Sequence, residues 1–234
     1  MNNAASIFLK AIKKDGAKIK LLGDSITHGV GGTGFMQNGV HISENFSRNP
    51  DGFCWAKLFK EYMAEKYGCE VVNNACTGTR IEFILEHFDT LVDKNDGIVI
   101  CTIGTNNRHI YFHEGPKCER EELLREFALN VERLYGKFRN SGVEVIFIAN
   151  IPASQKNELD GENYWRILHM NDINDVYKSK AEKLGFPFIS LYELFLEYCE
   201  AKKINYETLL ADGLHPNDDG YTAMFEIIKT ALGV

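Results

Sequence analysis

Apolar residues occur along this chain in two kinds of pattern, short continuous runs and longer runs with helical spacing. The clearest short run, residues 97–103, is rich in β-branched side chains and closes at Gly104, which is typical of a buried strand. Comparable runs predict four further strands, at residues 18–22, 71–73, 144–149 and 186–190.

The spaced patterns predict helices between these strands. Residues 53–67, 120–140 and 171–184 are amphipathic, and Asn217 is the predicted N-cap of a final helix. The apolar positions assigned to one face of the 120–140 helix are Leu123, Leu124, Phe127, Leu129, Val131, Leu134 and Phe138. This alternation of strands and helices predicts an α/β fold, with a parallel sheet covered by helices on both faces.

Two polar stretches, residues 28–52 and 151–164, fit neither pattern. Each follows the carboxyl end of a predicted strand, where ligands bind in open α/β sheets. Long irregular segments in compact domains are often functional. The chain has no repeat, linker or low-complexity tract, and its 234 residues suit one domain. We therefore expect a single domain, residues 1–234, with these stretches as insertions around an active site.

Charge and composition exclude several classes of protein. The net charge is −7 without any Lys/Arg cluster, and because nucleic-acid binding depends on a basic surface, no such partner is expected. The apolar stretches are far shorter than the roughly 20 residues that cross a bilayer, so no membrane insertion is expected. The six cysteines form no Cys-x-x-Cys pair and no signal peptide is recognisable, which favours a cytoplasmic location. No histidine pair has metal-site spacing, and no metal or cofactor is expected.

Ser25 and the neighbouring pair Asp212 and His215, which is distant from it in the sequence, could form a nucleophilic centre. The turn after the first predicted strand places the Ser25 hydroxyl at the carboxyl edge of the sheet. A serine hydroxyl needs a base to take its proton, and a histidine base needs a carboxylate to hold its second nitrogen. Asp212 and His215, with the flexible Gly213 between them, can meet on one turn. Taken singly, a turn serine and a helix-capping aspartate are the ordinary alternatives.

Acyl transfer also needs hydrogen-bond donors for the negative charge that develops on the carbonyl oxygen. Asn106 follows the third predicted strand and Gly78 follows the second, so both could present N–H groups at the same sheet edge as Ser25. A glycine at position 78 lets the backbone approach a ligand closely. For each residue alone, turn chemistry is the alternative interpretation.

These four segments together, in this order, resemble the SGNH hydrolases, the GDSL-type esterases, lipases and acylhydrolases, over nearly the whole chain. The segments are Gly23-Asp24-Ser25-Ile26-Thr27, Asn73-Asn74-Ala75-Cys76-Thr77-Gly78, Gly104-Thr105-Asn106-Asn107 and Asp212-Gly213-Leu214-His215-Pro216. The resemblance implies a three-layer α/β/α sandwich with a five-stranded parallel sheet in the flavodoxin-like strand order 2-1-3-4-5.

Carried over position by position, the resemblance implies that Ser25 is the nucleophile, His215 the base and Asp212 the partner that orients the imidazole. The backbone N–H groups of Ser25 and Gly78 and the side chain of Asn106 would form the oxyanion hole. Asp24 would support the nucleophile turn rather than react.

Five more residues are candidates for support or for the substrate pocket: Thr27, His28, Asn107, Arg80 and Arg108. The two arginines could bind an anionic part of a substrate or pair with surface acids. The chain departs from the family pattern at Ala75, Thr77 and Asn107. None of these is a reacting group, so the departures concern loop detail and substrate.

Two other classes compete with this interpretation. Residues 29–34, Gly-Val-Gly-Gly-Thr-Gly, match the spacing of a dinucleotide-binding fingerprint. The run begins several residues after the strand, no convincing helix follows it, and the second strand ends in Asn73-Asn74 rather than an acid. We therefore interpret it as an active-site loop. A non-catalytic protein on the same scaffold is the second alternative, because fold alone does not prove activity.

The predicted reaction is hydrolysis of a carboxylic ester through an acyl-enzyme. The 28–52 stretch is rich in Asn, Ser and Gly with only scattered Phe35, Met36 and Phe46, which favours a short acyl group such as acetyl on a sugar or another polar alcohol. Tyr164 and Trp165 could stack on a sugar ring. A lysophospholipase- or thioesterase-type acylhydrolase acting on longer acyl chains is the alternative.

Overall fold

The structure is a computed structural model that describes residues 3–13, 16–35, 52–108, 119–158 and 167–234. A five-stranded sheet lies at its centre, with the order β2-β1-β3-β4-β5 and parallel pairing throughout. The strands are β1 (Lys18–Gly23), β2 (Glu70–Asn73), β3 (Ile98–Thr102), β4 (Val145–Ala149) and β5 (Phe188–Ser190). The predicted parallel sheet and its strand order are confirmed.

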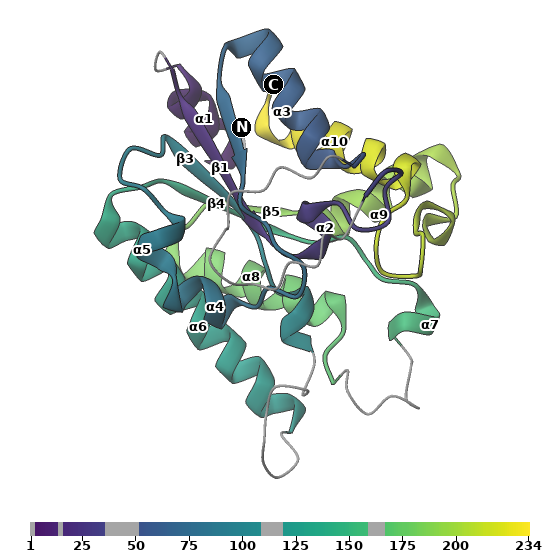
Figure 1. Cartoon of the computed structure of the whole chain (residues 1–234). Helices are drawn as coiled ribbons and strands as arrows, with labels where there is room; N and C mark the ends of the chain where they lie inside the picture. Colours follow the sequence, from purple (N-terminus) through teal and green to yellow (C-terminus); the bar gives the residue numbers. More distant parts are fainter. Residues whose placement is uncertain (1–2, 14–15, 36–51, 109–118, 159–166) are drawn as a thin grey trace.

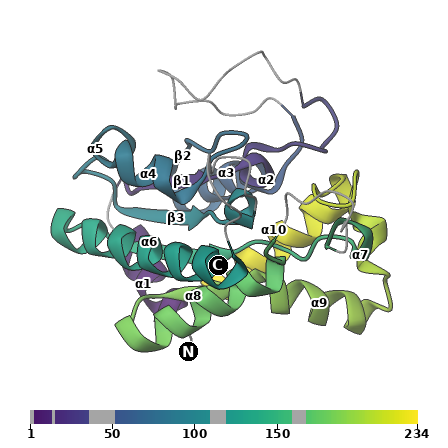
Figure 2. The same cartoon turned by 90° about the horizontal axis from the view of Figure 1, so that it is seen from below.

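Helices cover both faces of this sheet, as Figure 1 shows. One face carries α1 (Asn3–Ile12), α3 (Trp55–Tyr67), α9 (Leu191–Lys202) and α10 (Asp218–Leu232). The other carries α4 (Ile81–Glu86), α5 (Phe88–Leu91), α6 (Arg120–Ser141) and α8 (Met170–Leu184). Helices α6 and α8 run side by side beneath the sheet (Figure 2). The result is the three-layer α/β/α sandwich that was predicted.

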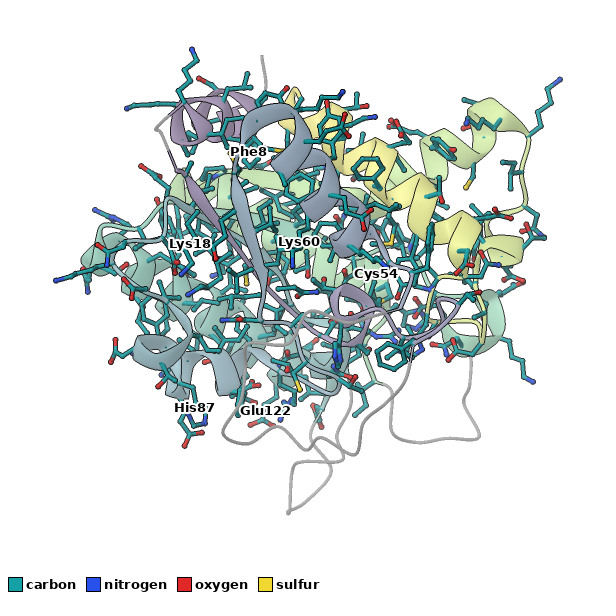
Figure 3. All side chains as sticks on the ribbon, turned by 45° about the horizontal axis from the view of Figure 1, so that its top comes forward. Phe8, Lys18, Cys54, Lys60, His87 and Glu122 are labelled. Carbon is teal, nitrogen blue, oxygen red and sulfur yellow. The ribbon has the colours of Figure 1, made fainter. Side chains whose placement is uncertain are left out.

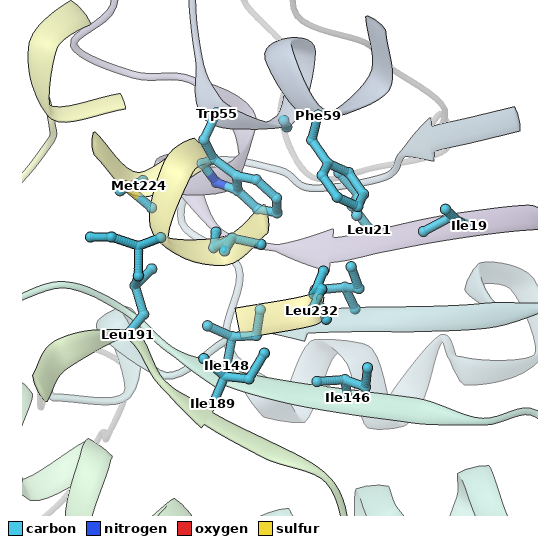
Figure 4. Close-up of a cluster of buried hydrophobic side chains, with 14 of the residues drawn as sticks. Ile19, Leu21, Trp55, Phe59, Ile146, Ile148, Ile189, Leu191, Met224 and Leu232 are labelled. Carbon is cyan, nitrogen blue, oxygen red and sulfur yellow. The ribbon is translucent and has the colours of Figure 1, made fainter. Parts of the chain in front are cut away.

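Strand side chains alternate between two apolar cores. In β3, Ile98 and Ile100 join the first core, beneath α1, α3, α9 and α10, whereas Val99 and Cys101 join the second core, against α4, α5, α6 and α8. Because both faces are covered, β3 and β4 are nearly continuous apolar runs. Figure 4 shows part of the first core around Trp55. Side chains fill the layers on both sides of the sheet (Figure 3).

All four predicted helices are present, as α3, α6, α8 and α10, and the structure corrects one residue assignment. Helix α6 ends at Gly142 in a left-handed conformation, and α10 begins after Asn217, whose side chain accepts a hydrogen bond from the Gly220 N–H. The assignment of Leu129 to the buried face of α6 was wrong, since its side chain is 44% exposed. It lies two positions from the buried Phe127, about 200° around the helix axis.

Strand β1, which lies between β2 and β3, contains a charged side chain that is almost fully buried. Lys20 is 5% exposed, and its Nζ lies 2.8 Å from Oδ2 of Asp96, which is itself buried in the turn before β3. Lys18 Nζ lies 3.6 Å from the other oxygen of the same carboxylate. A buried charge is tolerated when it is paired, so Asp96 explains how lysines fit in an otherwise apolar strand.

The predicted insertions are described only in part. Residues 28–35, 52 and 151–158 are described, and the second segment contains the one-turn helix α7 (Gln155–Glu158). The remainder of both insertions, with Met36, Phe46, Tyr164 and Trp165, lies outside the described residues. No helix in the described ranges is both long and apolar enough to cross a bilayer.

Candidate active site

Ser25 lies two residues after the end of strand β1. It is the first residue of α2 (Ser25–His28), and Asp24 caps this helix by accepting a hydrogen bond from the Ile26 N–H at 3.1 Å. The turn is tight, because a Cβ on Gly23 would collide with the hydroxyls of Thr102 and Thr27. Those two hydroxyls are themselves in contact across the strand ends. Thr27, a predicted supporting residue, therefore fixes the turn and lies buried behind Ser25.

His215 and Asp212 lie together on a short loop before α10. An isolated bridge between Leu210 and Pro216 closes this loop. The Asp212 Oδ1 atom accepts the backbone N–H of His215 at 2.8 Å, and its Oδ2 lies 2.7 Å from His215 Nδ1. One carboxylate thus holds both the backbone and the ring of the same histidine.

The loop brings the imidazole to the serine. His215 Nε2 lies 2.9 Å from Ser25 Oγ, although 190 residues separate the two in the sequence. Because Asp212 accepts a hydrogen bond from Nδ1, the Nε2 atom is the acceptor for the serine hydroxyl proton. The three residues that the sequence singled out as nucleophile, base and orienting partner form one hydrogen-bonded relay.

The Asp212 carboxyl is held in its ionised form. Partial burial raises its pKa, but hydrogen bonds from the backbone and ring of His215, the His215 charge and the Leu214 N–H together outweigh burial, so the pKa lies below its ordinary value. Hydrogen bonds to the charged form are the expected cause of such a shift. An ionised Asp212 is the form that favours a positive charge on the adjacent imidazole.

The predicted anion-binding groups face the same sheet edge. Gly78 has a φ of +79°, a left-handed conformation that favours glycine. The Asn106 side chain, in the 3₁₀ turn η1 (Thr105–Arg108), donates to the Thr79 carbonyl at 2.9 Å and has a second amide hydrogen. Within the described part of the chain, the backbone N–H groups of Ser25 and Gly78 have no hydrogen-bond acceptor.

Asp24 belongs to a buried network that the sequence interpretation missed. Its Oδ2 accepts a hydrogen bond from Asn150 Nδ2 at 3.1 Å, and the same amide donates to Thr105 Oγ1 at 2.7 Å. Burial raises the pKa of Asp24, against the lowering effect of hydrogen bonds from Thr105 and Ile26 and of the His215 charge. Asn150 thereby joins the turn that holds Ser25 to the turn that holds Asn106. Its position directly after a strand was the available signal.

His28 and Asn107 are placed as supports for neighbouring loops. His28 Nδ1 lies 3.0 Å from the Thr77 hydroxyl, so it links α2 to the loop that contains Gly78. Asn107 is 3% exposed, its Oδ1 accepts the Ile81 N–H at 3.1 Å, and its amide donates to Glu82. Asn107 therefore couples η1 to the start of α4 and is not exposed as a pocket wall.

The two candidate arginines pair with acids. Arg80 Nε lies 3.5 Å from Glu82 Oε2. Arg108 is completely buried, donates to the Thr105 carbonyl at 3.1 Å, and pairs with Glu158 of α7 at 3.1 Å. Arg108 was a candidate either for binding an anionic part of the substrate or for pairing with an acid. Its burial and its contacts fit the pairing role.

The glycine loop of residues 29–34 packs against the histidine loop. Tyr221 of α10 donates to the Val30 carbonyl at 2.6 Å, and the Thr33 N–H donates to Asp218 Oδ1 at 2.7 Å. A Cβ on Gly31, whose φ is +96°, would collide with the Pro216 carbonyl oxygen and lie 3.1 Å from His215 Cβ. In the dinucleotide fingerprint the glycines lead into a helix N-terminus, whereas here they allow two loops to approach.

The histidine loop is also held by the segment that follows β4. On the other side of the histidine loop, the Ser154 N–H donates to the Gly213 carbonyl at 2.7 Å, which joins the loop after β4 to the loop that holds Asp212. Among the described side chains, no three His, Cys, Asp or Glu residues cluster in a way that could hold a metal ion.

Comparisons with known proteins agree with this arrangement. The model of the GDSL-like lipase/acylhydrolase family matches residues 21–223. No curated protein sequence matches the chain. An acetylxylan esterase from Geobacillus stearothermophilus, solved as a catalytic mutant, is 18% identical with a TM-score of 0.66, and the match covers 94% of this chain and 95% of that one.

Two other solved structures are similar to a comparable degree. A lipase/acylhydrolase from Enterococcus faecalis is 20% identical with a TM-score of 0.64, over 92% of this chain and 95% of that one. An α/β hydrolase enzyme from the metagenome of Lake Arreo, Spain, is 19% identical with a TM-score of 0.68, over 93% and 95%. With the family model matched over most of its length, this chain belongs to the GDSL-like lipase/acylhydrolase family and is a carboxylic ester hydrolase with the SGNH hydrolase fold.

Proposed function

We propose that this ester hydrolase attacks its substrate with Ser25, with His215 as the base and Asp212 as the residue that orients and stabilises the imidazole. The observation that supports these roles is the unbroken relay from Asp212 through His215 to the Ser25 hydroxyl, with contacts of 2.7 and 2.9 Å. Both distances lie within hydrogen-bonding reach, so proton transfer needs no movement of the three groups.

The reaction proceeds in two halves. The Ser25 Oγ atom forms a bond to the ester carbonyl carbon while His215 Nε2 takes the hydroxyl proton, and the alcohol leaves with that proton from the imidazolium. Water then attacks the acyl-serine, His215 accepts a proton from this water, and it returns a proton to Ser25 as the carboxylic acid is released. The ionised Asp212 stabilises the imidazolium in both halves.

Three donors hold the tetrahedral oxyanion: the N–H groups of Ser25 and Gly78 and the side-chain amide of Asn106. Their common position at the sheet edge supports this role, as does the hydrogen bond that fixes Asn106 to the Thr79 carbonyl. A donor of this kind contributes about 3 kcal/mol to transition-state stabilisation.

We further propose that the acyl group is short, such as acetyl, and that the alcohol is a sugar or another polar compound. Polar side chains border the described part of the site, with His28 against Thr77 and Asn106 against the Gly78 loop. The fold shared with an acetylxylan esterase is consistent with such a substrate.

Turnover of p-nitrophenyl acetate and p-nitrophenyl octanoate tests both parts of this proposal. We expect acetate to be the better substrate, and Ser25→Ala to lower kcat roughly 10⁴-fold or more, whereas Ser179→Ala, an exposed serine on α8, should match the parent. A fluorophosphonate probe should label the parent and not Ser25→Ala. A preference for octanoate would favour a lysophospholipase- or thioesterase-type acylhydrolase, and full activity in Ser25→Ala would refute the assigned nucleophile.

A further inference from the structure

A pocket of about 580 Å³, separate from the residues proposed for catalysis, opens beside the loop that holds Asp212 and His215. It lies between α7, the start of α8, the start of α9 and the 3₁₀ turn η2 (Tyr206–Leu209). Its size falls within the range of small-molecule sites in proteins, about 300–1,000 Å³. None of the residues proposed for ester hydrolysis lines it.

This pocket is structurally coupled to the histidine loop. The Ser154 N–H donates to the Gly213 carbonyl at 2.7 Å, and the next residue, Gln155, lines the pocket. The Gln155 N–H donates to Glu207 Oε1 at 2.6 Å, and the Tyr206 hydroxyl donates to the Ala153 carbonyl at 3.2 Å. Residues 153–155 therefore contact the histidine loop and also line the pocket.

Two partly buried tyrosines form the aromatic part of the lining. Burial raises the pKa of the Tyr192 hydroxyl, helped by the negative charge of Glu158. Burial likewise raises the pKa of Tyr206, with further contributions from Glu207 and from Tyr192. Both side chains are thus neutral phenols, and each offers an apolar ring face together with a polar tip. A sugar ring, with its apolar C–H face and its hydroxyl rim, matches that combination.

The charges of the pocket are largely satisfied by the protein itself. Glu158 pairs with the buried Arg108 and accepts the Met170 N–H, and one oxygen of Glu207 is used by Gln155. The remaining polar groups of the lining are the side chains of Gln155, Asn171, Asn205 and His169, the Tyr192 hydroxyl and the second Glu207 oxygen. The amides and hydroxyls can exchange hydrogen bonds with neutral sugar hydroxyls. Glu207 has no basic partner among the described side chains, so it is the group of this lining that would attract a cation.

We propose that this pocket is a binding subsite for a neutral saccharide, in which the sugar part of an acylated oligosaccharide is held against Tyr192 and Tyr206 beside the histidine loop. The inference rests on the proposed function for its link to catalysis. Binding of an unacylated sugar in the pocket does not depend on that link, so the two can be tested separately.

Binding of unacylated tetrasaccharides tests the subsite directly. Xylotetraose, cellotetraose and maltotetraose are titrated into the protein and followed by calorimetry and by NMR. We expect at least one to bind, with its affinity lowered about fivefold by Tyr192→Ala through loss of the ring, and less by Tyr192→Phe, which keeps the ring. Tyr198→Ala is the matched control, because Tyr198 lies on the same helix but borders the groove between α9 and α10.

The charge of the ligand is tested with Glu207→Gln and with choline as a cationic probe. The glutamine can still accept the Gln155 N–H, so tetrasaccharide affinity should stay within about twofold. Binding of choline that Glu207→Gln abolishes, without tetrasaccharide binding, would overturn the proposal. So would tetrasaccharide binding that neither Tyr192 variant changes, provided that both variants keep the thermal unfolding transition of the parent.

A kinetic ratio connects the pocket to catalysis. In Tyr192→Ala, kcat/KM for acetylated xylotetraose should fall about fivefold relative to kcat/KM for p-nitrophenyl acetate, and Tyr198→Ala should leave this ratio unchanged. An unchanged ratio in Tyr192→Ala, with hydrolysis still dependent on Ser25, would refute the subsite and leave the proposed function intact. If tetrasaccharide binding depends on Tyr192 but hydrolysis does not depend on Ser25, the subsite is supported and the proposed function is refuted.

Discussion

Asn150 is a single residue on which two parts of the site depend. Its side-chain amide donates to Asp24, 126 residues away in the sequence, and to Thr105, 45 residues away. Asp24 caps the turn that begins with Ser25, and Thr105 precedes Asn106. The relative position of the proposed nucleophile and of the proposed oxyanion donor therefore depends on one buried amide group.

Replacement of this amide should reduce both stability and turnover. In Asn150→Ala, the buried Asp24 carboxyl group and the Thr105 hydroxyl lose a donor, which should cost about 1–3 kcal/mol of unfolding free energy. We expect kcat for p-nitrophenyl acetate to fall roughly tenfold or more, because the reacting groups lose their alignment. Asn95→Ala, at an exposed loop asparagine, should change neither quantity. Parent-like turnover in Asn150→Ala would show that the network does not position the site.

Among single residues, the sequence identified those that take part in the chemistry and recur together in known motifs. It missed residues that only hold other residues in position. Ser25, Asp212 and His215 are recognisable because their short segments recur as a set. Asn150 and Ser154 act through hydrogen bonds whose partners are distant in the sequence, so the position of Asn150 after a strand could mark it but could not identify those partners. The burial of Arg108 was likewise not predictable, since its partner Glu158 lies 50 residues away.

At the level of elements, the glycine loop of residues 29–34 fixes the histidine loop from one side. Gly31 lies so close to the Pro216 carbonyl oxygen that no side chain fits between the two loops. Hydrogen bonds of Tyr221 and Asp218 attach the glycine loop to the start of α10, the helix that directly follows the histidine loop. The position of His215 relative to Ser25 is thus set by loop packing as well as by Asp212.

A methyl group at position 31 should separate the two loops. We expect Gly31→Ala to lower kcat/KM for p-nitrophenyl acetate roughly 100-fold, because a displacement near 1 Å is enough for such a loss. Gly16→Ala is the control: Gly16 also has a positive φ, +68°, but a Cβ there would meet no atom within 4 Å. Both glycines have a positive φ, and only Gly31 faces a collision, so equal activities in the two variants would exclude the loop contact as the cause.

Element prediction succeeded where local pattern and tertiary environment agree. All five strands lie within two residues of their predicted positions, because strands that are buried on both faces consist mainly of apolar residues. Helices α1, α4, α5 and α9 were not predicted. Helices α4 and α5 are short, and α9 begins directly after β5 without an intervening loop. Packing against the sheet specifies these helices more than their own sequence does.

For the whole molecule, the buried Asp24 carboxyl makes stability depend on pH. Its pKa is raised in the folded protein, chiefly by burial, so the folded state binds the proton more tightly than the unfolded chain. The stability from this protonated group is complete below the ordinary carboxyl range, about pH 4, and is lost as pH rises through the raised pKa.

The variant Asp24→Asn isolates this contribution. Its side chain cannot ionise, so its unfolding free energy relative to the parent should rise as pH increases from about 4, by at most about 1.4 kcal/mol per pH unit. Denaturant unfolding of both proteins across this range measures the difference. Asp93→Asn, at an exposed carboxyl whose pKa is lowered by the Asn95 N–H, should show a constant difference above about pH 5. Parallel curves for Asp24→Asn and the parent would contradict the raised pKa.

The bridge between Leu210 and Pro216 has a consequence for how this enzyme would lose and regain activity. It closes residues 211–215 into a small unit in which Asp212 is bonded to the backbone and ring of His215. If this unit shifts, the acid and the imidazole move together and keep their mutual hydrogen bonds, while the hydrogen bond to the serine is broken. To recover activity, the loop has only to return to Ser25 as one unit, because Asp212 and His215 are already hydrogen-bonded to each other.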